Sequence, residues 1–377
     1  MFLSLDEDAT SAYSARAWLR LSPTLRRFLS AYEHRRHCFF LSPRQLDNVR
    51  THCDLNDGDR RLLSSYEAKL IETAALHKRS LFRLVVDPRA TSVSIDVGPP
   101  YVVTMGSAHF DQFDVVGFSG LYAEDVANDS EWYLFLSDAL SDVLHLPGVR
   151  CALEPSHAGG GGLIGHFPRF VQGRSRGLCV LDRDSHGSWE QAGPHASDVR
   201  RRAIRARVLA ANDSDYSSII PFVGISTTSF RNVSNSIPPQ LLEHFYSQWD
   251  RKPEQLTILR DCFPKFPELS PDEWRMWLGI NFETPGDRAS IAAAFQGRTS
   301  PRTVTRYLAA VDRLGPPRIS KGITGRILSE MQRAPKSRQL VEKKIREAMD
   351  AEEYRTAIEM MIVPMTHLGA SVRNAVI

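Results

Sequence analysis

The first part of the chain changes from helical periodicity to short β-branched runs. Between residues 60 and 78, apolar positions recur three and four residues apart, and Asn56 and Asp57 precede them with side chains that can cap a helix. From Leu81 the pattern becomes LFRLVV and then SVSIDVGPPYVVTM, with breaks at Asp-Pro and Gly-Pro-Pro. These patterns predict a mostly helical stretch over 1–80, followed by short strands joined by turns.

The middle of the chain, from about 114 to 215, alternates strand-like and helix-like segments. The apolar run VVGFSGLYAE ends in an acid, EWYLFLSDALSDVLHL has helical spacing, VRCALEP is strand-like, and GLCVL is a compact apolar run that leads into DRDSHGS. Strands that alternate with helices predict a small α/β domain with a largely parallel sheet. In such sheets, functional groups gather at the carboxyl ends of the strands.

Helical periodicity returns after about residue 235. It continues through seven candidate segments, 239–250, 253–261, 271–281, 287–296, 301–313, 322–333 and 338–349. We therefore predict a helical N-terminal region with short strands over 1–112, an α/β domain over 113–235 and an all-α domain over 236–377. The predicted fold class is α/β with a parallel sheet at the centre, flanked by a mixed helical and β region and by a helical C-terminal region.

Composition is that of an ordinary globular protein, since 42% of residues are hydrophobic and 24% are charged. No run approaches the roughly 20 apolar residues that span a bilayer, and the start, MFLSLDEDATS, does not predict a secretory signal. The five cysteines are scattered and form no CxxC pair, which argues for reduced thiols and against a zinc ribbon. We expect a cytoplasmic protein with no membrane partner.

Positive charge is concentrated in two segments, although the net charge of the chain is only +3. Between Arg298 and Arg346 the chain has thirteen Lys or Arg residues and three acids, so the remainder carries −7. A second basic run without acids comprises Arg200, Arg201, Arg202, Arg205 and Arg207. Segregated positive charge suits a phosphate-binding surface, because neutralising a polyanion releases its counterions. The alternative is a solvated helix face that aids solubility. We expect nucleic-acid contacts from Arg200, Arg201 and Arg205.

Three acidic residues directly follow two predicted strands. Glu124 comes after the first, and Asp182 and Asp184 come after another, with 58 positions between Glu124 and Asp182. The i, i+2 spacing puts the two aspartates on one side of an extended backbone. Carboxylates pressed together repel unless a cation neutralises them, and oxygen-only ligation favours Mg²⁺ or Mn²⁺ over zinc. Such an ion can polarise a phosphodiester. The alternative is an acidic loop in which the aspartates cap the next helix.

This ordered set of motifs resembles the TOPRIM family, the metal-binding module of topoisomerases, bacterial primases, small ribosomal-RNA maturases and OLD-type nucleases. The family has an apolar strand ending in Glu, a glycine-bearing turn, and an apolar strand ending in Asp-x-Asp; this chain has GLYAE, AGGGG and GLCVLDRD. The resemblance covers about 100 of 377 residues, and it implies catalytic and metal-binding roles for Glu124, Asp182 and Asp184. Asp125 stands where the family has a glycine. Asp129 lies one position beyond the place where the family has a further acid. Each of these two aspartates is therefore an alternative or an additional metal ligand.

Two features beside the acids have competing interpretations. The glycines at 159–162 either let the backbone approach phosphate or form a tight turn beside the metal site, and they lack the Lys-Ser/Thr of a nucleotide P-loop. His186 follows Asp184 by two positions, so it either contacts the metal or phosphate or is a surface residue that caps a helix.

The stretch DRASIAAAFQGRTSPRTVTRYLAAVDRL predicts two helices joined by a turn near Gly297. Ser300 is a good N-cap and Pro301 suits the first helical position. The apolar residues of a shared core would be Ile291, Ala294, Phe295, Val304, Tyr307 and Leu308. The basic residues facing outward would be Arg298, Arg302 and Arg306. This pattern resembles the DNA-binding helix-turn-helix, whose second helix enters the major groove, although the turn is one residue longer. An ordinary helical hairpin is the alternative.

Together these features predict a divalent-metal-dependent nuclease that cleaves phosphodiester bonds, with DNA favoured over RNA as its nucleic-acid partner. The TOPRIM resemblance also implies an antiphage defence system and an ABC-type ATPase, which would be a separate subunit because this chain has no Walker A sequence. The N-terminal 110 residues carry no chemical motif and would serve assembly, including homo-oligomerisation. The alternative function is a non-catalytic nucleic-acid-binding regulator or assembly scaffold with a degenerate TOPRIM-like core.

Overall fold

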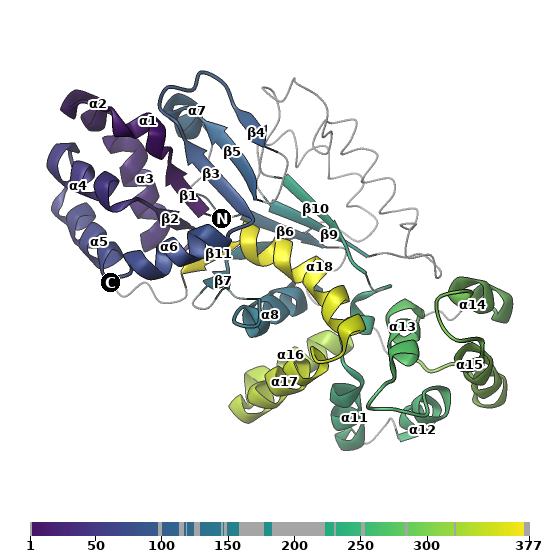
Figure 1. Cartoon of the computed structure of the whole chain (residues 1–377). Coiled ribbons are helices and arrows are strands. Elements are labelled where there is room, and N and C mark those ends of the chain that lie inside the picture. Colours follow the sequence, from purple (N-terminus) through teal and green to yellow (C-terminus); the bar gives the residue numbers. More distant parts are fainter. Residues whose placement is uncertain are drawn as a thin grey trace.

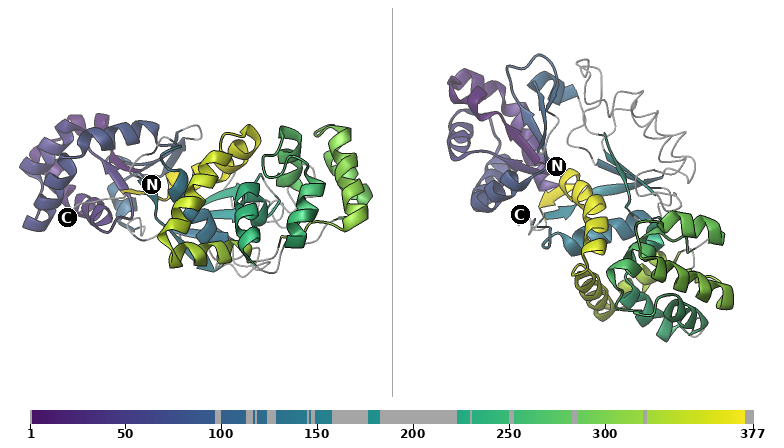
Figure 2. Two further views of the ribbon diagram at one scale, coloured as in Figure 1. Left: turned by 90° about the horizontal axis from the view of Figure 1, so that it is seen from below. Right: turned by 45° about the vertical axis from the view of Figure 1, so that its right-hand side comes forward.

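The computed structural model describes residues 2–96, 100–112, 117, 119–123, 129–144, 146, 149–157, 177–182, 223–229, 231–249, 253–282, 286–319 and 322–372. Two α/β units and a group of C-terminal helices make up this part of the chain (Figure 1). The N-terminal unit and most of the C-terminal helices lie at opposite ends of the molecule, with the second sheet between them (Figure 2).

The N-terminal unit is built on a five-stranded sheet in the order β2-β1-β3-β5-β4. Its strands are β1 (Phe2–Leu5), β2 (Cys38–Phe40), β3 (Phe82–Val86), β4 (Ser94–Asp96) and β5 (Tyr101–Met105). All neighbouring pairs are parallel except β4 with β5. The helices of this unit are α1 (Glu7–Ser11), α2 (Ala15–Arg20), α3 (Ser22–Glu33), α4 (Pro43–His52), α5 (Asp57–Glu67), α6 (Leu70–Arg79) and α7 (Ser107–Gln112).

The first eighty residues are mostly helical, as predicted, but they also contain the short strands β1 and β2, which were not predicted. Both strands are only three or four residues long, and β1 is buried throughout. A strand buried on both faces has no alternation of apolar and polar residues, so its sequence carries no strand period. The helix predicted over 60–78 is present but is divided into α5 and α6, and Asn56 caps α5 as predicted.

The central unit contains a four-stranded sheet in the order β10-β9-β6-β8. Its strands are β6 (Ser119–Ala123), β8 (Leu153–His157), β9 (Gly177–Leu181) and β10 (Val223–Thr227), and helix α8 (Glu131–Leu140) follows β6. All its neighbouring pairs are parallel, which confirms the predicted parallel sheet. The predicted strand VRCALEP is in fact two strands, because β7 (Val149–Cys151) leaves the sheet and pairs antiparallel with β11 (Ala370–Val372).

The C-terminal region is helical, as predicted. After the short helix η4 (Val233–Ser236) its helices are α11 (Pro239–Gln248), α12 (Pro253–Cys262), α13 (Pro271–Gly279), α14 (Arg288–Phe295), α15 (Pro301–Leu314), α16 (Ile323–Arg333), α17 (Pro335–Ala348) and α18 (Glu352–Leu368). Helix α18, yellow in Figure 1, returns to the central unit and packs on β9, β10 and α8 before leading into β11. The regions predicted as 113–235 and 236–377 therefore share packed side chains.

Strand β9 connects the two α/β units because its side chains alternate between two hydrophobic clusters. Leu178 and Val180 belong to the cluster formed with α8 and the C-terminal helices, whereas Cys179 and Leu181 pack with the N-terminal unit. All five residues of β9 are buried. Burial on both faces explains why the segment GLCVL is apolar at every position after its glycine.

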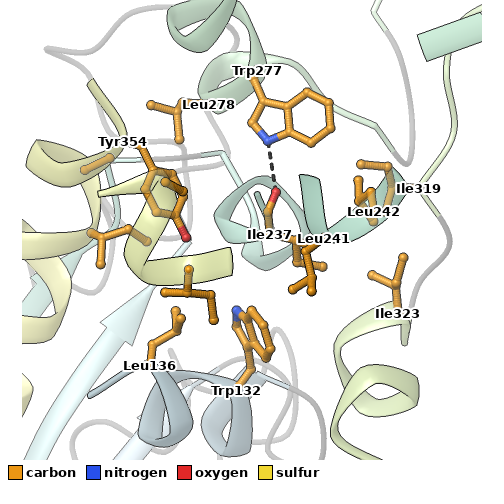
Figure 3. Packing of buried hydrophobic residues seen from close by; sticks show 14 of the residues in the cluster. Trp132, Leu136, Ile237, Leu241, Leu242, Trp277, Leu278, Ile319, Ile323 and Tyr354 are labelled. Carbon is orange, nitrogen blue, oxygen red and sulfur yellow. Dashed lines mark hydrogen bonds between the residues drawn. The ribbon is translucent and has the colours of Figure 1, made fainter. Parts of the chain in front are cut away.

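The larger cluster contains three aromatic residues whose polar atoms are hydrogen-bonded (Figure 3). Trp277 Nε1 donates to the carbonyl of Ile237 over 3.2 Å, and the Tyr354 hydroxyl donates to the carbonyl of Ser236 over 2.7 Å. Trp132 Nε1 donates to Ser236 Oγ over 2.8 Å. Because each buried donor has a partner, these rings contribute apolar area without an unsatisfied polar group. The three bonds hold α8, α13 and α18 around η4.

Candidate functional site

The acidic constellation is associated with the carboxyl edge of the central sheet. Strands β6 and β9 are parallel neighbours, with Leu121 opposite Leu178. The last residue of β6 directly precedes Glu124, and the last residue of β9 directly precedes Asp182. Parallel neighbours end at the same edge of a sheet. Asp182 is among the described residues, whereas Glu124 and Asp184 lie outside them, so the convergence of all three carboxylates stays a prediction.

Asp182 is half-buried and is held by a side chain from the neighbouring helix α8. The hydroxyl of Tyr133 donates a hydrogen bond to Asp182 Oδ1 over 3.1 Å. Tyr133 is itself 1% exposed, so its ring is fixed by packing. Helix α8, which follows β6, therefore contacts the end of β9. This contact links the two strands that precede the predicted ligands.

Asp129, predicted as an additional metal ligand, is 7% exposed and lies just before the first residue of α8. It precedes Tyr133 by four positions in the sequence. A buried carboxylate is costly unless charge or hydrogen bonds compensate it.

The donor atoms at this edge fit a hard dication. Among the described residues, no three His, Cys, Asp or Glu side chains form a metal-binding group, and two of the predicted ligands fall outside that part of the chain. The described acids, Asp129 and Asp182, supply oxygen atoms only, which Mg²⁺ and Mn²⁺ prefer. The residues present are therefore compatible with the expected ion.

Thiol chemistry is excluded by the burial of all five cysteines, none of which forms a disulfide. Burial raises the pKa of Cys38 to about 12 and that of Cys151 to about 11. A thiol becomes a nucleophile or a soft-metal ligand only as the thiolate. The cysteines are therefore packing residues, in agreement with the prediction of reduced thiols.

An open pocket of about 490 Å³ lies between α13, α18 and the turn before α15. One wall begins at the sheet edge, where the backbone N–H of Thr228 donates to the carbonyl of Leu181 over 2.9 Å. The next residue, Ser229, lines the pocket, together with Arg298 and Met360. The pocket therefore reaches from the segment that follows β10 to the turn before α15.

Arg275 is the central charged residue of this pocket. Its guanidinium donates to the carboxylates of Asp272 over 3.2 Å and of Glu353 over 2.9 Å, and to the carbonyl of Arg298 over 3.3 Å. These contacts join α13, α18 and the α14–α15 turn. Since the arginines that line the pocket are matched by Glu352 and Glu353, the pocket has no large excess of one charge.

The predicted helical pair is present as α14 and α15. Asp287 caps α14 and Ser300 caps α15, with Pro301 in the first turn. Five of the six predicted core residues are buried, namely Ile291, Phe295, Val304, Tyr307 and Leu308, and Ala294 is partly buried. The structure therefore confirms the apolar core that the sequence predicts for this pair. DNA contact by this unit stays a prediction.

The cations of the basic C-terminal segment differ in what they contact, and Arg326, for example, lies over the ring of Trp249. Many are already paired: Arg313 with Asp261, Arg333 with Glu330, Arg338 with Glu342, Lys343 and Lys344 with Glu347, and Arg346 with Asp142. Arg302 and Arg306 are exposed and make no ion pair within the described chain. They lie four residues apart, on one face of α15. The charge count alone does not distinguish these two from the paired cations.

Several predicted residues lie outside the described part of the chain. They are the basic run with Arg200, Arg201 and Arg205, the glycines at 159–162, and His186. Sequence reasoning missed Tyr133 and Arg275. Tyr133 stands in EWYLFL, where an aromatic residue at helical spacing is indistinguishable from core. The ion pair of Arg275 with Glu353 spans 78 positions, and no local pattern indicates it.

Comparison with known proteins gives no relative: no family model, no curated protein and no solved structure matches this chain. None of the helices in the described segments is long and apolar enough to cross a membrane. The function is therefore inferred from the residues and geometry of the chain itself.

Proposed function

We propose that this chain is a divalent-metal-dependent nuclease with a TOPRIM-like central domain. The observation that carries the proposal is the adjacency of β6 and β9, which end at one sheet edge directly before Glu124 and Asp182. Two residues far apart in sequence thereby start from neighbouring strand ends. The buried Asp129 and the hydrogen-bonded Asp182 support the same site.

In this proposal Glu124, Asp182 and Asp184 hold the cation, with Asp129 as a further ligand. When bound, Mg²⁺ or Mn²⁺ polarises the phosphodiester and stabilises charge on the leaving oxygen. The TOPRIM resemblance gives Glu124 a second role as general acid or base. The protein's own contribution is to fix these carboxylates on rigid strand ends, since positioning is a large part of phosphoryl-transfer catalysis.

The nucleic acid is proposed to bind along α15, whose Arg302 and Arg306 are exposed and unpaired within the described residues. Arg298, at the turn before α15, lines the pocket that also contains Ser229 beside the sheet edge. This pocket lies beside the turn before α15 and beside the segment that follows β10. The proposed substrate contacts α15 and extends from there to the metal site.

The experiment that tests the function compares cleavage of plasmid, single-stranded DNA and RNA with Mg²⁺, with Mn²⁺ and with EDTA. Cleavage is expected only with a divalent ion, for wild type and not for Asp182→Asn. If no substrate is cleaved under any condition, with or without a partner subunit, the nuclease proposal is wrong.

Replacing Arg302 and Arg306 together with glutamine is expected to weaken nucleic-acid binding and flatten its salt dependence. The logarithm of the binding constant decreases as the logarithm of the salt concentration increases, and each cation that neutralises a phosphate contributes about 0.9 to the steepness of this decrease. The plot for the double variant should therefore be shallower by about 2 units. Fluorescence anisotropy with a labelled duplex, in EDTA and at several salt concentrations, measures this slope.

The matched control is Arg338→Gln with Lys344→Gln, which removes the same charge from residues already paired with Glu342 and Glu347. We expect this pair to retain nearly the wild-type slope. Equal effects from both double variants would mean that only net charge matters and that α15 is not the docking surface.

The second candidate function is a non-catalytic nucleic-acid-binding regulator or scaffold with a degenerate core. The specific observation in its favour is that α14 and α15 form a capped helical pair whose exposed arginines are separate from the acidic residues after β6 and β9. Binding that is equal with and without divalent ions, with no cleavage, would support it. The antiphage role and the separate ATPase subunit remain proposals from the TOPRIM resemblance.

A further inference from the structure

The contact between Tyr133 and Asp182 lies at the point where helix α8 meets the end of β9. The phenol donates to Oδ1 of the carboxylate over 3.1 Å. A carboxylate has two oxygens, and this bond engages one of them, Oδ1. The contact restricts rotation of the carboxylate without occupying both of its oxygens.

The phenol is fixed because α8 is anchored on both sides of Tyr133. One residue before it, Trp132 Nε1 donates to Ser236 Oγ over 2.8 Å. Four residues after it, the hydroxyls of Ser137 and Thr366 are hydrogen-bonded over 2.6 Å. Trp132 and Leu136, in the same helix, point into the large hydrophobic cluster (Figure 3). Tyr133 therefore has little freedom to follow a moving carboxylate.

We propose that Tyr133 is a positioning residue that orients the Asp182 carboxylate to receive a divalent cation. The inference rests on the proposed function, because it assigns Tyr133 a role through Asp182. Groups that hydrogen-bond to metal ligands fix the direction of the ligand, and their loss typically costs 10- to 100-fold in metal affinity or activity. Tyr133 also joins the two strand ends of the site, since α8 follows β6 and Asp182 follows β9.

The test is the affinity of full-length Tyr133→Phe for Mn²⁺, measured by titration calorimetry and by the electron paramagnetic resonance signal of free Mn²⁺. Phenylalanine keeps the buried ring and removes only the hydroxyl. We expect the dissociation constant to rise about 10- to 100-fold. Because the missing hydrogen bond orients a ligand, kcat at saturating Mn²⁺ should recover toward the wild-type value.

The matched control is Tyr354→Phe, which removes another buried tyrosine hydroxyl from the same hydrophobic cluster. The Tyr354 hydroxyl donates to the carbonyl of Ser236, which is a backbone group and not a carboxylate. Both variants are expected to lower the melting temperature by similar amounts. Only Tyr133→Phe should bind Mn²⁺ more weakly, which separates positioning of Asp182 from a general decrease in stability.

The possible failures are distinguishable. If wild type binds Mn²⁺ and cleaves nucleic acid but Tyr133→Phe binds Mn²⁺ with unchanged affinity, the positioning role is overturned and the nuclease proposal stands. If both tyrosine variants lose affinity equally, the effect is structural and the positioning role is again overturned. If wild type neither binds Mn²⁺ nor cleaves, the proposed function and the role of Tyr133 fail together.

Discussion

Replacing Asp182 with asparagine is expected to reduce metal-dependent cleavage by at least about 100-fold, because removal of a direct ligand should exceed the 10- to 100-fold cost of losing a residue that supports one. Asparagine keeps the shape of the side chain and can still accept the hydrogen bond from Tyr133. The variant therefore removes charge while largely preserving packing. Initial rates of plasmid nicking across a range of Mn²⁺ concentrations measure the effect.

Asp350→Asn is the control for this variant, since it makes the same chemical change at an exposed acid in the turn before α18. We expect it to cleave at the wild-type rate. If Asp182→Asn also retained wild-type activity, the carboxylate after β9 would not be a ligand, and any nuclease activity would have to come from another part of the chain.

Replacing Gly177 with alanine is expected to lower the free energy of unfolding by about 3 kcal/mol or more, from backbone strain and steric overlap together. Gly177 begins β9 opposite Gly120 of β6, and its φ is 156°, a conformation that residues with a side chain rarely adopt. A Cβ atom there would lie 2.1 Å from the carbonyl oxygen of Gly120. Urea denaturation of both proteins measures the difference.

Gly297→Ala is the matched control, because Gly297 also has a positive φ, of 74°, but a Cβ atom would meet nothing within 4 Å. This variant should show only the conformational cost of about 1 kcal/mol. A similar decrease in both variants would show that the close approach of β6 and β9 is not tightly constrained. In that case, the carboxyl ends of these two strands would not hold the proposed site rigidly.

The elements that the sequence predicts best are those whose burial is one-sided. Helix α15 has an apolar stripe, an N-cap at Ser300 and a proline at its start, and its bounds agree closely with the prediction. Helix α18 was not among the predicted segments, although Tyr354, Ala357, Ile358, Met361, Ile362 and Met365 form a buried stripe at helical spacing. Pro364 within this stripe resembles a helix breaker.

Long-range pairing is the part of the fold that local patterns do not reveal. The segment VRCALEP looks like one strand, yet β7 pairs with β11 from more than two hundred positions later, while β8 joins the parallel sheet. Hydrophobic periodicity reports which face of an element is buried but not what covers it. For the same reason, the sequence does not predict the contacts of α18 with the central sheet.

The sequence predicts those features of the candidate site that depend only on residue type and on the order of the strands. The acids after two apolar strands indicate oxygen ligands at one sheet edge, and the adjacency of β6 and β9 agrees with this. Tyr133 could not be identified, because its role depends on how α8 packs against the end of β9. Which of the basic residues form ion pairs can likewise be known only from the three-dimensional structure.

Diffraction at the manganese absorption edge, from crystals of the full-length protein grown with Mn²⁺, tests the proposed metal site most directly. We predict an anomalous peak at the carboxyl edge of β6 and β9, about 2 Å from carboxylate oxygens of Glu124 and Asp182. No peak at that edge, with Glu124, Asp182 and Asp184 directed away from one another, would contradict the proposed site.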